Sequence, residues 1–254
     1  MTGDLSQLEA VLVVLAGFGA GALNAVVGSG SLITFPTLVA VGLPPLTANV
    51  SNTVGLVPGA VASVYGYRRE LTGLRSTLRH LLPATGLGAL AGVVLLLLFP
   101  ETVFEAVVPA LVGLAVLLVL LQPLVARRAA VKGPRVGTAP WLWGAVGLTG
   151  VYGAYFGAAQ GVLLIGVLGL GTALHLQQAN AVKNVLAGSA NLVAGLAFAV
   201  VAPVDWTAAL LVAVGASAGG LLGARFARRL PTRVLRGVVV VVGLAALALL
   251  LAGG

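Results

Sequence analysis

The side chain that most clearly suggests ligand chemistry in this 254-residue sequence is a lysine inside an apolar segment. Lys183 lies between Val182 and Val185, whereas every other Lys or Arg lies in or beside a predicted loop. No Asp or Glu falls inside an apolar segment, so the sequence offers this ammonium no carboxylate partner. A charge at the centre of a bilayer costs about 2.5–3.5 kcal/mol on insertion scales. Lys183 therefore predicts a site for an anionic ligand, unless the side chain snorkels to the headgroups from near the end of its helix.

Amide side chains share one predicted helical face with this lysine. At about 100° per residue, one polar stripe forms on the second half of the chain: Asn180, Lys183, Asn184, Ala187 and Asn191. The matching stripe in the first half is Asn49, Asn52, Thr53, Gly59 and Ala60. Amide, hydroxyl and ammonium donors suit the oxygens of sulfite, a sulfonate or a carboxylate better than a metal cation. The alternative is that the amides only form interhelical hydrogen bonds that hold the bundle together.

Glycine-rich breaks interrupt two of the apolar segments. The first break contains Gly28, Ser29, Gly30 and Ser31, and the second contains Gln160. A half-helix that restarts at Ser31 or Val162 has unpaired N–H groups and the positive end of its dipole at the break, which is a ready anion site. The other interpretation is that these glycines only let helices pack closely, and we adopt that interpretation for the spaced pairs Gly88/Gly92 and Gly219/Gly223.

Composition indicates an integral membrane protein, because 59% of residues are hydrophobic, 8% are charged and the mean hydropathy is +1.12. The net charge of +8 does not indicate a nucleic-acid partner, because the basic residues lie in short loops beside apolar runs. The absence of cysteine excludes disulfides, thiol catalysis and thiolate metal sites. With two histidines and no carboxylate in the spans, we expect no enzyme, no cofactor and no metal site.

Ten apolar segments follow one another along the chain. They are Leu8–Val27, Ser31–Val41, Ala48–Tyr67, Leu81–Phe99, Val103–Leu124, Trp141–Ala158, Val162–Leu174, Ala179–Val201, Trp206–Phe226 and Val234–Leu251. A helix needs about 20 residues to cross a bilayer, so the second and seventh segments are predicted half-helices or arms of re-entrant hairpins. We expect an all-α polytopic membrane protein with eight to ten membrane segments.

The two halves of the chain match each other without gaps at an offset of 131 residues, so that Asn49 answers to Asn180 and Gly30 to Gly161. Their basic loops do not match. In the first half the loop after the third segment is basic (Arg68, Arg69, Arg75, Arg79), and in the second half the loop after the fourth segment is (Arg225, Arg228, Arg229, Arg233, Arg236). Because Lys and Arg stay on the cytoplasmic side, the halves are predicted to cross the bilayer in opposite directions. Such inverted-topology repeats are typical of secondary transporters.

The repeat predicts one membrane transporter domain over residues 1–254, with both termini outside. Repeat one covers residues 8–125, a basic cytoplasmic linker covers 126–140, and repeat two covers 141–254.

Three groups of residues resemble a known family: Gly17 to Gly21 with Val27 to Pro36, Gly42 to Pro45 with Ala48-Asn49, and Gln178 to Gly188 with Val204-Asp205-Trp206. In these motifs the chain is similar to the TauE/SafE family of sulfite exporters and organosulfonate permeases, over nearly its whole length. The resemblance implies a multi-pass carrier of the bacterial cytoplasmic membrane, driven by a proton or sodium gradient. The sequence departs from the pattern at the second break, where Ala158, Ala159 and Gln160 stand opposite the serines of the first.

Together these observations predict an alternating-access transporter of small anions, with sulfite or organosulfonates as the substrate class. An anion channel and a transporter of small carboxylates remain alternatives, and a homo-oligomer remains open. The predicted substrate-binding residues are Lys183, Asn180, Asn184, Asn49, Asn52, Gly28, Ser29, Gly30, Ser31 and Gln160. The coupling ion is a proton, held by Lys183 or by the substrate, or a sodium ion on unwound backbone carbonyls.

Overall fold

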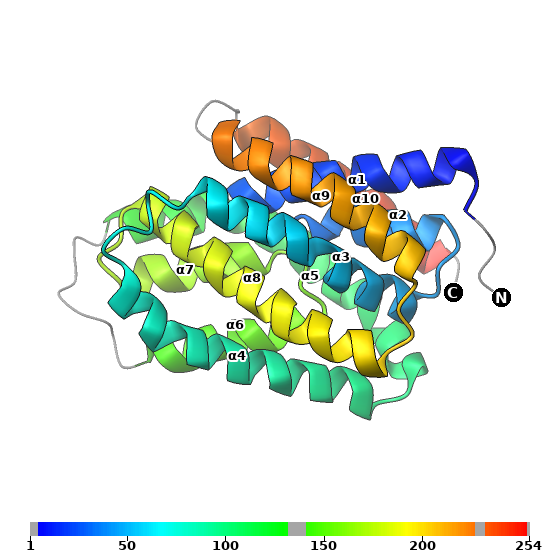
Figure 1. Cartoon of the computed structure of the whole chain (residues 1–254), viewed down its shortest axis with the longest axis horizontal. Helices are drawn as coiled ribbons and strands as arrows, with labels where there is room; N and C mark the ends of the chain where they lie inside the picture. Colours follow the sequence, from blue (N-terminus) through cyan, green and yellow to red (C-terminus); the bar gives the residue numbers. More distant parts are fainter. Residues whose placement is uncertain (1–4, 132–140, 227–231, 253–254) are drawn as a thin grey trace.

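The computed structural model describes residues 5–131, 141–226 and 232–252, and this part of the chain is entirely helical (Figure 1). Its helices are α1 (Gln7–Val26), α2 (Ser31–Ala40), α3 (Pro45–Gly66), α4 (Arg75–Leu98), α5 (Glu101–Val131), α6 (Leu142–Tyr155), α7 (Gln160–Gly171), α8 (Leu176–Val201), α9 (Trp206–Phe226) and α10 (Thr232–Ala252). The all-α prediction is confirmed, and each predicted apolar segment corresponds to one helix. The second and seventh segments form the short helices α2 and α7, with 10 and 12 residues.

Local chemistry explains where the long helices begin. Ser6 and Glu9 form a reciprocal capping box at the start of α1. Pro45 occupies the first position of α3, where a missing N–H is harmless. His175 caps α8 by accepting a hydrogen bond from the Gln178 N–H at 3.3 Å.

Several helix boundaries differ from the sequence prediction by two residues or more. Helix α4 begins at Arg75, six residues before the predicted Leu81, and α7 begins at Gln160 instead of Val162. Helix α5 continues to Val131, into the segment predicted as linker 126–140, because the alanines and arginines after Leu124 are strong helix formers. The remainder of that linker, residues 132–140, lies outside the described residues, as do Arg228 and Arg229.

The two sets of five helices pack in matching pairs and interlock. The first helix of each half lies against the fourth helix of the other, so that α1 packs on α9 and α6 packs on α4. The third helices α3 and α8 pack on each other, as do the fifth helices α5 and α10. The equivalent helices α3 and α8 run in opposite directions through the bundle (Figure 1). An inverted repeat requires this arrangement. The single domain and the bounds of its repeats stay predictions.

Glycines set the distance between the interlocked helices. A Cβ on Gly219 would overlap the Phe18 carbonyl of α1, and a Cβ on Gly88 would overlap the Gly147 carbonyl of α6. Gly92 and Gly223 likewise meet backbone atoms of the opposing helix. The packing role predicted for these spaced glycines is therefore confirmed, because only hydrogen fits where two backbones approach so closely.

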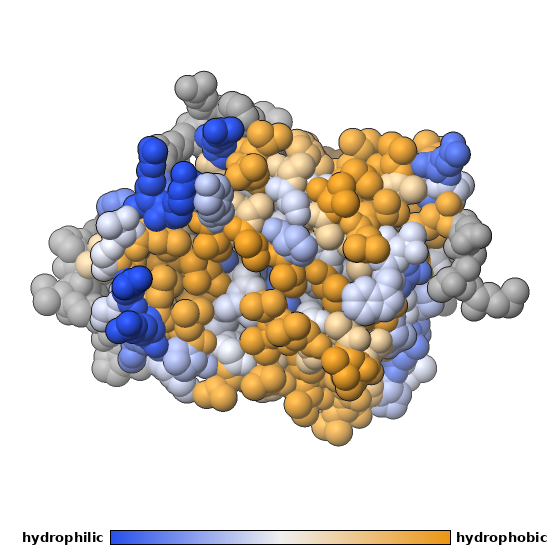
Figure 2. Space-filling view, in the orientation of Figure 1, coloured by the Kyte–Doolittle hydropathy of each residue, from blue (hydrophilic) through white to orange (hydrophobic). Residues whose placement is uncertain are grey.

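The surface is that of a multi-pass membrane protein. Figure 2 shows hydrophobic residues over the middle of the molecule and hydrophilic groups gathered toward its two ends. The most strongly hydrophilic patches lie at the left end of Figure 2. There the turn between α3 and α4 and the start of α4 present four exposed arginines: Arg68, Arg69, Arg75 and Arg79. Five of the described helices, namely α1, α4, α5, α8 and α9, are long and apolar enough to cross a bilayer. We call the arginine end the basic end and the end with Glu101, Glu105 and Asp205 the acidic end.

Candidate functional site

The two glycine-rich breaks meet at one point inside the bundle. Gly28, after the end of α1, has φ +82°, and Ala159, 131 residues later, has φ +60°. The Gly161 N–H donates to the Gly28 carbonyl at 3.0 Å. A Cβ on either of these two glycines would overlap the backbone of the other. The breaks therefore cross in direct backbone contact, which leaves no room for any side chain at Gly28 or Gly161.

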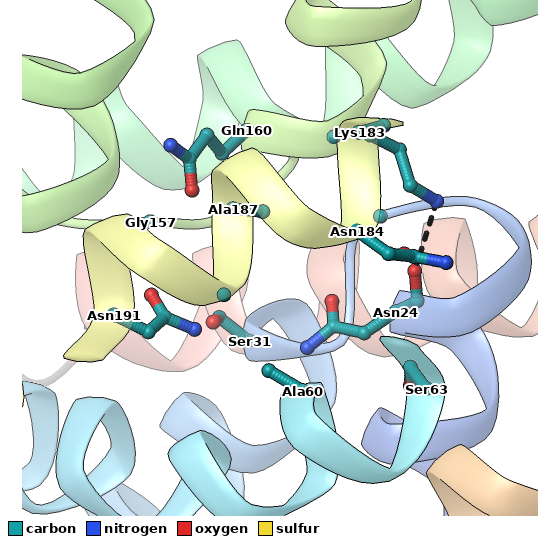
Figure 3. A pocket seen from close by; sticks show the side chains of 13 residues that line it. Asn24, Ser31, Ala60, Ser63, Gly157, Gln160, Lys183, Asn184, Ala187 and Asn191 are labelled. Atoms are coloured by element: carbon teal, nitrogen blue, oxygen red, sulfur yellow. Dashed lines mark hydrogen bonds between the residues drawn. The ribbon is translucent and has the colours of Figure 1, made fainter. Parts of the chain in front are cut away.

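Helix α8 of the second half holds the end of α1. Lys183 is fully buried, and its Nζ donates to the Asn24 carbonyl at 3.0 Å and to the Ala25 carbonyl at 3.3 Å (Figure 3). The Asn184 amide also donates to the Ala25 carbonyl, at 3.3 Å. A cation at a helix C-terminus is favourable, because the last carbonyls have no partner within the helix and form the negative end of the dipole.

Helix α3 of the first half holds the end of α6 in the reciprocal manner. The Asn49 Nδ2 donates to the Tyr155 carbonyl, the last of α6, at 3.0 Å. One turn further on, the Asn52 Nδ2 donates to Ser31 Oγ at 3.2 Å, and its Oδ1 accepts a hydrogen bond from the Thr34 hydroxyl. Each broken helix is thus anchored by the third helix of the other half.

A cavity with an empty volume of about 420 Å³, including its open mouth, lies beside the crossing. It is lined by Asn24, Gly28, Ser31, Ala60, Ser63, Gly157, Gln160, Gly161, Lys183, Asn184, Ala187, Gly188 and Asn191. Residues from both halves contribute, chiefly from α3, α8 and the two breaks. Lys183 is the single charged residue of this lining, and no carboxylate belongs to it.

The polar groups of the cavity come from several directions. Figure 3 shows Asn24 and Asn191 pointing toward one another across it. The Asn24 Oδ1 accepts the Gly30 N–H at 2.7 Å, which leaves its NH₂ group for a ligand. The Gln160 Nε2 donates to the Thr149 carbonyl at 3.0 Å, and its oxygen is turned toward the cavity (Figure 3). One buried ammonium surrounded by amides and hydroxyls is suited to a small polar anion.

Aromatic rings pack together around the end of α6. The Phe35 and Phe156 rings pack edge to face with centroids 5.3 Å apart, and Phe104 packs on Tyr155 at 5.9 Å. Phe104 belongs to the first turn of α5, which begins at the acidic end. The positions 131 residues away from Phe35 and Phe156 are the small residues Gly166 and Ala25. We call Phe35, Phe104, Tyr155 and Phe156 the aromatic cluster, and Phe104 places it toward the acidic end, where α5 begins.

The structure brings half of the predicted site residues to the cavity. Those that line it are Gly28, Ser31, Gln160, Lys183 and Asn184. Those that do not are Ser29, Gly30, Asn49, Asn52 and Asn180. Ser29, Gly30, Asn49 and Asn52 are buried elsewhere, and Asn180 is half-buried. A role in substrate binding stays a prediction for all ten.

The structure decides between the two interpretations of Lys183 and corrects one expectation about the breaks. Lys183 does not snorkel, because it is fully buried and its amine donates to the carbonyls at the end of α1. The N–H groups at the restart points are also mostly satisfied. Gly30 N–H is bonded by Asn24 and Gly161 N–H by Gly28, so the second break offers less to an anion than expected.

Eight lining residues were not among the predicted binding residues, namely Asn24, Ala60, Ser63, Gly157, Gly161, Ala187, Gly188 and Asn191. Asn24 had a usable signal, since it is an amide within an apolar segment immediately before a glycine break. Ser63 had none, because serine is common on transmembrane helices and this one lies a turn beyond the predicted stripe.

The family model described as Sulfite exporter TauE/SafE matches residues 13–250. The chain belongs to the TauE/SafE family. The resemblance seen in the sequence is thereby confirmed, and with it a membrane transporter as the broad class. No solved structure matches this TauE/SafE chain.

Three curated relatives extend over most of this TauE/SafE chain. It is 27% identical to the probable membrane transporter protein YfcA of Escherichia coli K12 over 88% of this chain and 82% of the relative. It is 27% identical to the probable membrane transporter protein ORF9 of a Sinorhizobium species, over 95% and 92% of the two chains. A probable membrane transporter protein of Haemophilus influenzae is 26% identical over 89% and 88%.

Proposed function

We propose that this protein is a secondary transporter that moves small anions, sulfite or organosulfonates, across the bacterial cytoplasmic membrane by alternating access. The observation that carries the proposal is the cavity between the two halves, whose single charged group is the buried ammonium of Lys183. A cavity with this lining attracts an anion and repels a free cation. The name of the matching family, sulfite exporter, supports sulfur oxyanions as the substrate class.

The anion enters from the basic end and lies among Lys183, Asn24, Asn191 and Ser31. Amide and hydroxyl donors bind its oxygens, and the Lys183 ammonium balances its charge while still bonded to the end of α1. Small carboxylates have oxygens of similar size, so charge alone does not separate them from sulfite. A pyramidal arrangement of three oxygens uses donors from several sides of the cavity, which favours sulfur oxyanions.

Alternation then requires the cavity to close on the basic side and the aromatic cluster to open on the acidic side. Among the contacts between the halves that would change are the hydrogen bonds from α8 to the end of α1 and from α3 to the end of α6. Rocking of one half against the other about the Gly28–Gly161 crossing exposes the site to each side in turn.

The test is solid-supported-membrane electrophysiology on purified protein in liposomes. Rapid jumps of sulfite, thiosulfate, organosulfonates and small carboxylates are compared for wild type, Lys183→Met and Asn191→Ala. We expect saturable currents for sulfur oxyanions, no current for Lys183→Met, and a raised KM for Asn191→Ala. Asn191 lines the cavity without a hydrogen bond to another described side chain, so its variant leaves the scaffold intact.

The matched control is Arg225→Met, which removes an exposed cation from the last turn of α9 and should change no current. Currents that grow linearly with concentration would indicate a channel instead. Saturable currents for carboxylates alone would replace the substrate class. Unchanged currents in both Lys183→Met and Asn191→Ala would remove the cavity as the transport site.

A further inference from the structure

Two broken helices end inside this bundle, yet among the described residues only one of the two ends has a side-chain cation against it. The last carbonyls of a helix have no N–H partner within the helix and form the negative end of its dipole. At the protein surface water satisfies them, but α1 and α6 end in the interior. Each end therefore needs hydrogen-bond donors or a cation supplied from elsewhere.

At the end of α1 the chain supplies that group itself. The Lys183 ammonium lies 3.0 Å from the Asn24 carbonyl and 3.3 Å from the Ala25 carbonyl, fully buried. The position 131 residues before Lys183 is Asn52, which is neutral. Its amide is engaged by Ser31 and Thr34 and not by the end of α6. The equivalent cation is therefore missing from the first half.

The end of α6 has a buried side-chain oxygen, Asn49 Oδ1, that has no hydrogen-bond partner. Asn49 is 1% exposed, and its Nδ2 bonds the Tyr155 carbonyl while its Oδ1 is buried with no hydrogen-bond partner. Within the described residues, the carbonyls of Gly153 and Ala154 accept no backbone N–H from beyond the helix end. Leaving a buried oxygen without a partner is costly, so the unpaired Asn49 oxygen points to a bound species that the chain does not provide.

We propose that a monovalent cation, sodium, binds at the C-terminus of α6 and is coordinated by Asn49 Oδ1 and the Tyr155 carbonyl oxygen. It takes the place at α6 that the Lys183 ammonium takes at α1. The Tyr155 carbonyl has a second lone pair for it while accepting the Asn49 amide. Neutral amide and carbonyl oxygens without a carboxylate suit a singly charged hard cation better than a divalent one. One half of the protein thus holds its cation covalently, and the other takes it from solution.

The role of this ion rests on the proposed transport function. Asn49 joins α3 of the first half to α6 of the second, so the ion stabilises one of the contacts between the halves that must change during alternation. Binding of sodium there would couple its gradient to movement of the anion. Binding of sodium itself requires no anion and is measured separately.

The experiment measures sodium binding to the purified full-length protein without anion substrate. Radioactive ²²Na⁺ is titrated in a scintillation proximity assay, with choline chloride keeping the ionic strength constant. We expect saturable binding to wild type. Asn49→Ala should weaken it at least about tenfold, the equivalent of about 1.4 kcal/mol, and Asn49→Asp should tighten it by adding a carboxylate oxygen. The matched control is Asn180→Ala, at the equivalent position of the second half, which should bind sodium as wild type does.

A second variant supplies the missing cation. Asn52→Lys places an ammonium at the position equivalent to Lys183 and should abolish sodium binding in a protein that still elutes as a folded species. Absence of saturable binding to wild type, or binding that Asn49→Ala leaves intact, would overturn the inference. Anion currents that persist in that case keep the transport proposal. Sodium binding that depends on Asn49, together with no anion current, would keep the site and overturn the transport proposal.

Discussion

Replacing Gly28 by alanine tests whether the crossing of the two breaks holds the site together. Gly28 has φ +82°, which side chains rarely adopt, and its Cβ would overlap the backbone of Gly161. The overlapped atoms are main-chain atoms at the start of α7, so no flexible side chain can move aside. Gly73 provides a matched control, because it has φ +81° with no atom within 4 Å of its Cβ position.

The two variants share one cost and differ in two others. Left-handed backbone costs a residue with a Cβ about 1–2 kcal/mol, which is the whole expected effect of Gly73→Ala. Gly28→Ala adds overpacking of about 1–3 kcal/mol. It also weakens the hydrogen bond between Gly161 N–H and the Gly28 carbonyl, worth about 0.5–1.5 kcal/mol. We therefore expect Gly28→Ala to destabilise the fold by about 3–6 kcal/mol, some three times as much as the control.

The assay is thermal unfolding in detergent followed by intrinsic fluorescence, for which the chain has three tryptophans. Gly28→Ala should lower the apparent melting temperature by at least twice the shift of Gly73→Ala. Anion currents should be lost in Gly28→Ala and kept in Gly73→Ala. Equal melting temperatures for the two variants would refute the reasoning, because they would show that the two breaks are not in backbone contact.

Two further predictions concern the cavity and the packing around it. The chain has no cysteine, so single cysteines can be labelled selectively. Asn191→Cys, in the cavity lining, should react with an impermeant maleimide applied from the basic side, while the buried Leu38→Cys should not. Equal labelling of the two variants would contradict a cavity that is open on one side. Gly219→Leu should destabilise the protein by several kcal/mol, since its Cβ would overlap the α1 backbone, whereas Gly113→Leu, with its nearest neighbour at 3.9 Å, should cost far less. Comparison of their melting temperatures checks this, and similar losses would count against close backbone packing.

Much of the architecture follows from local properties of the sequence. A run of apolar residues forms a helix in a membrane wherever it lies, because only a helix satisfies its own backbone there. The short second and seventh segments, the spaced glycines at Gly88 and Gly219 and the arginine-rich turn are all visible without knowing any contact. The orientation of the repeats in a bilayer remains a prediction from their charges.

The partners of the buried polar residues were decided only by the tertiary structure. Lys183 bonds a carbonyl 159 residues earlier in the chain, and Asn49 bonds one 106 residues later. Their apolar neighbours in the sequence indicate that each side chain needs a hydrogen-bond partner, but not which helix end provides it.

The same limit applies to the difference between the halves. The sequence shows that the two breaks differ chemically, yet it does not show that a cavity lies beside their crossing or that the Phe35 and Phe156 rings pack on each other. Which space fills depends on how side chains from α2, α5 and the end of α6 meet in space. Hydrophobicity acts on each segment separately and is readable from order alone, whereas cavities and buried hydrogen bonds are properties of pairs of surfaces that exist only after the chain has folded.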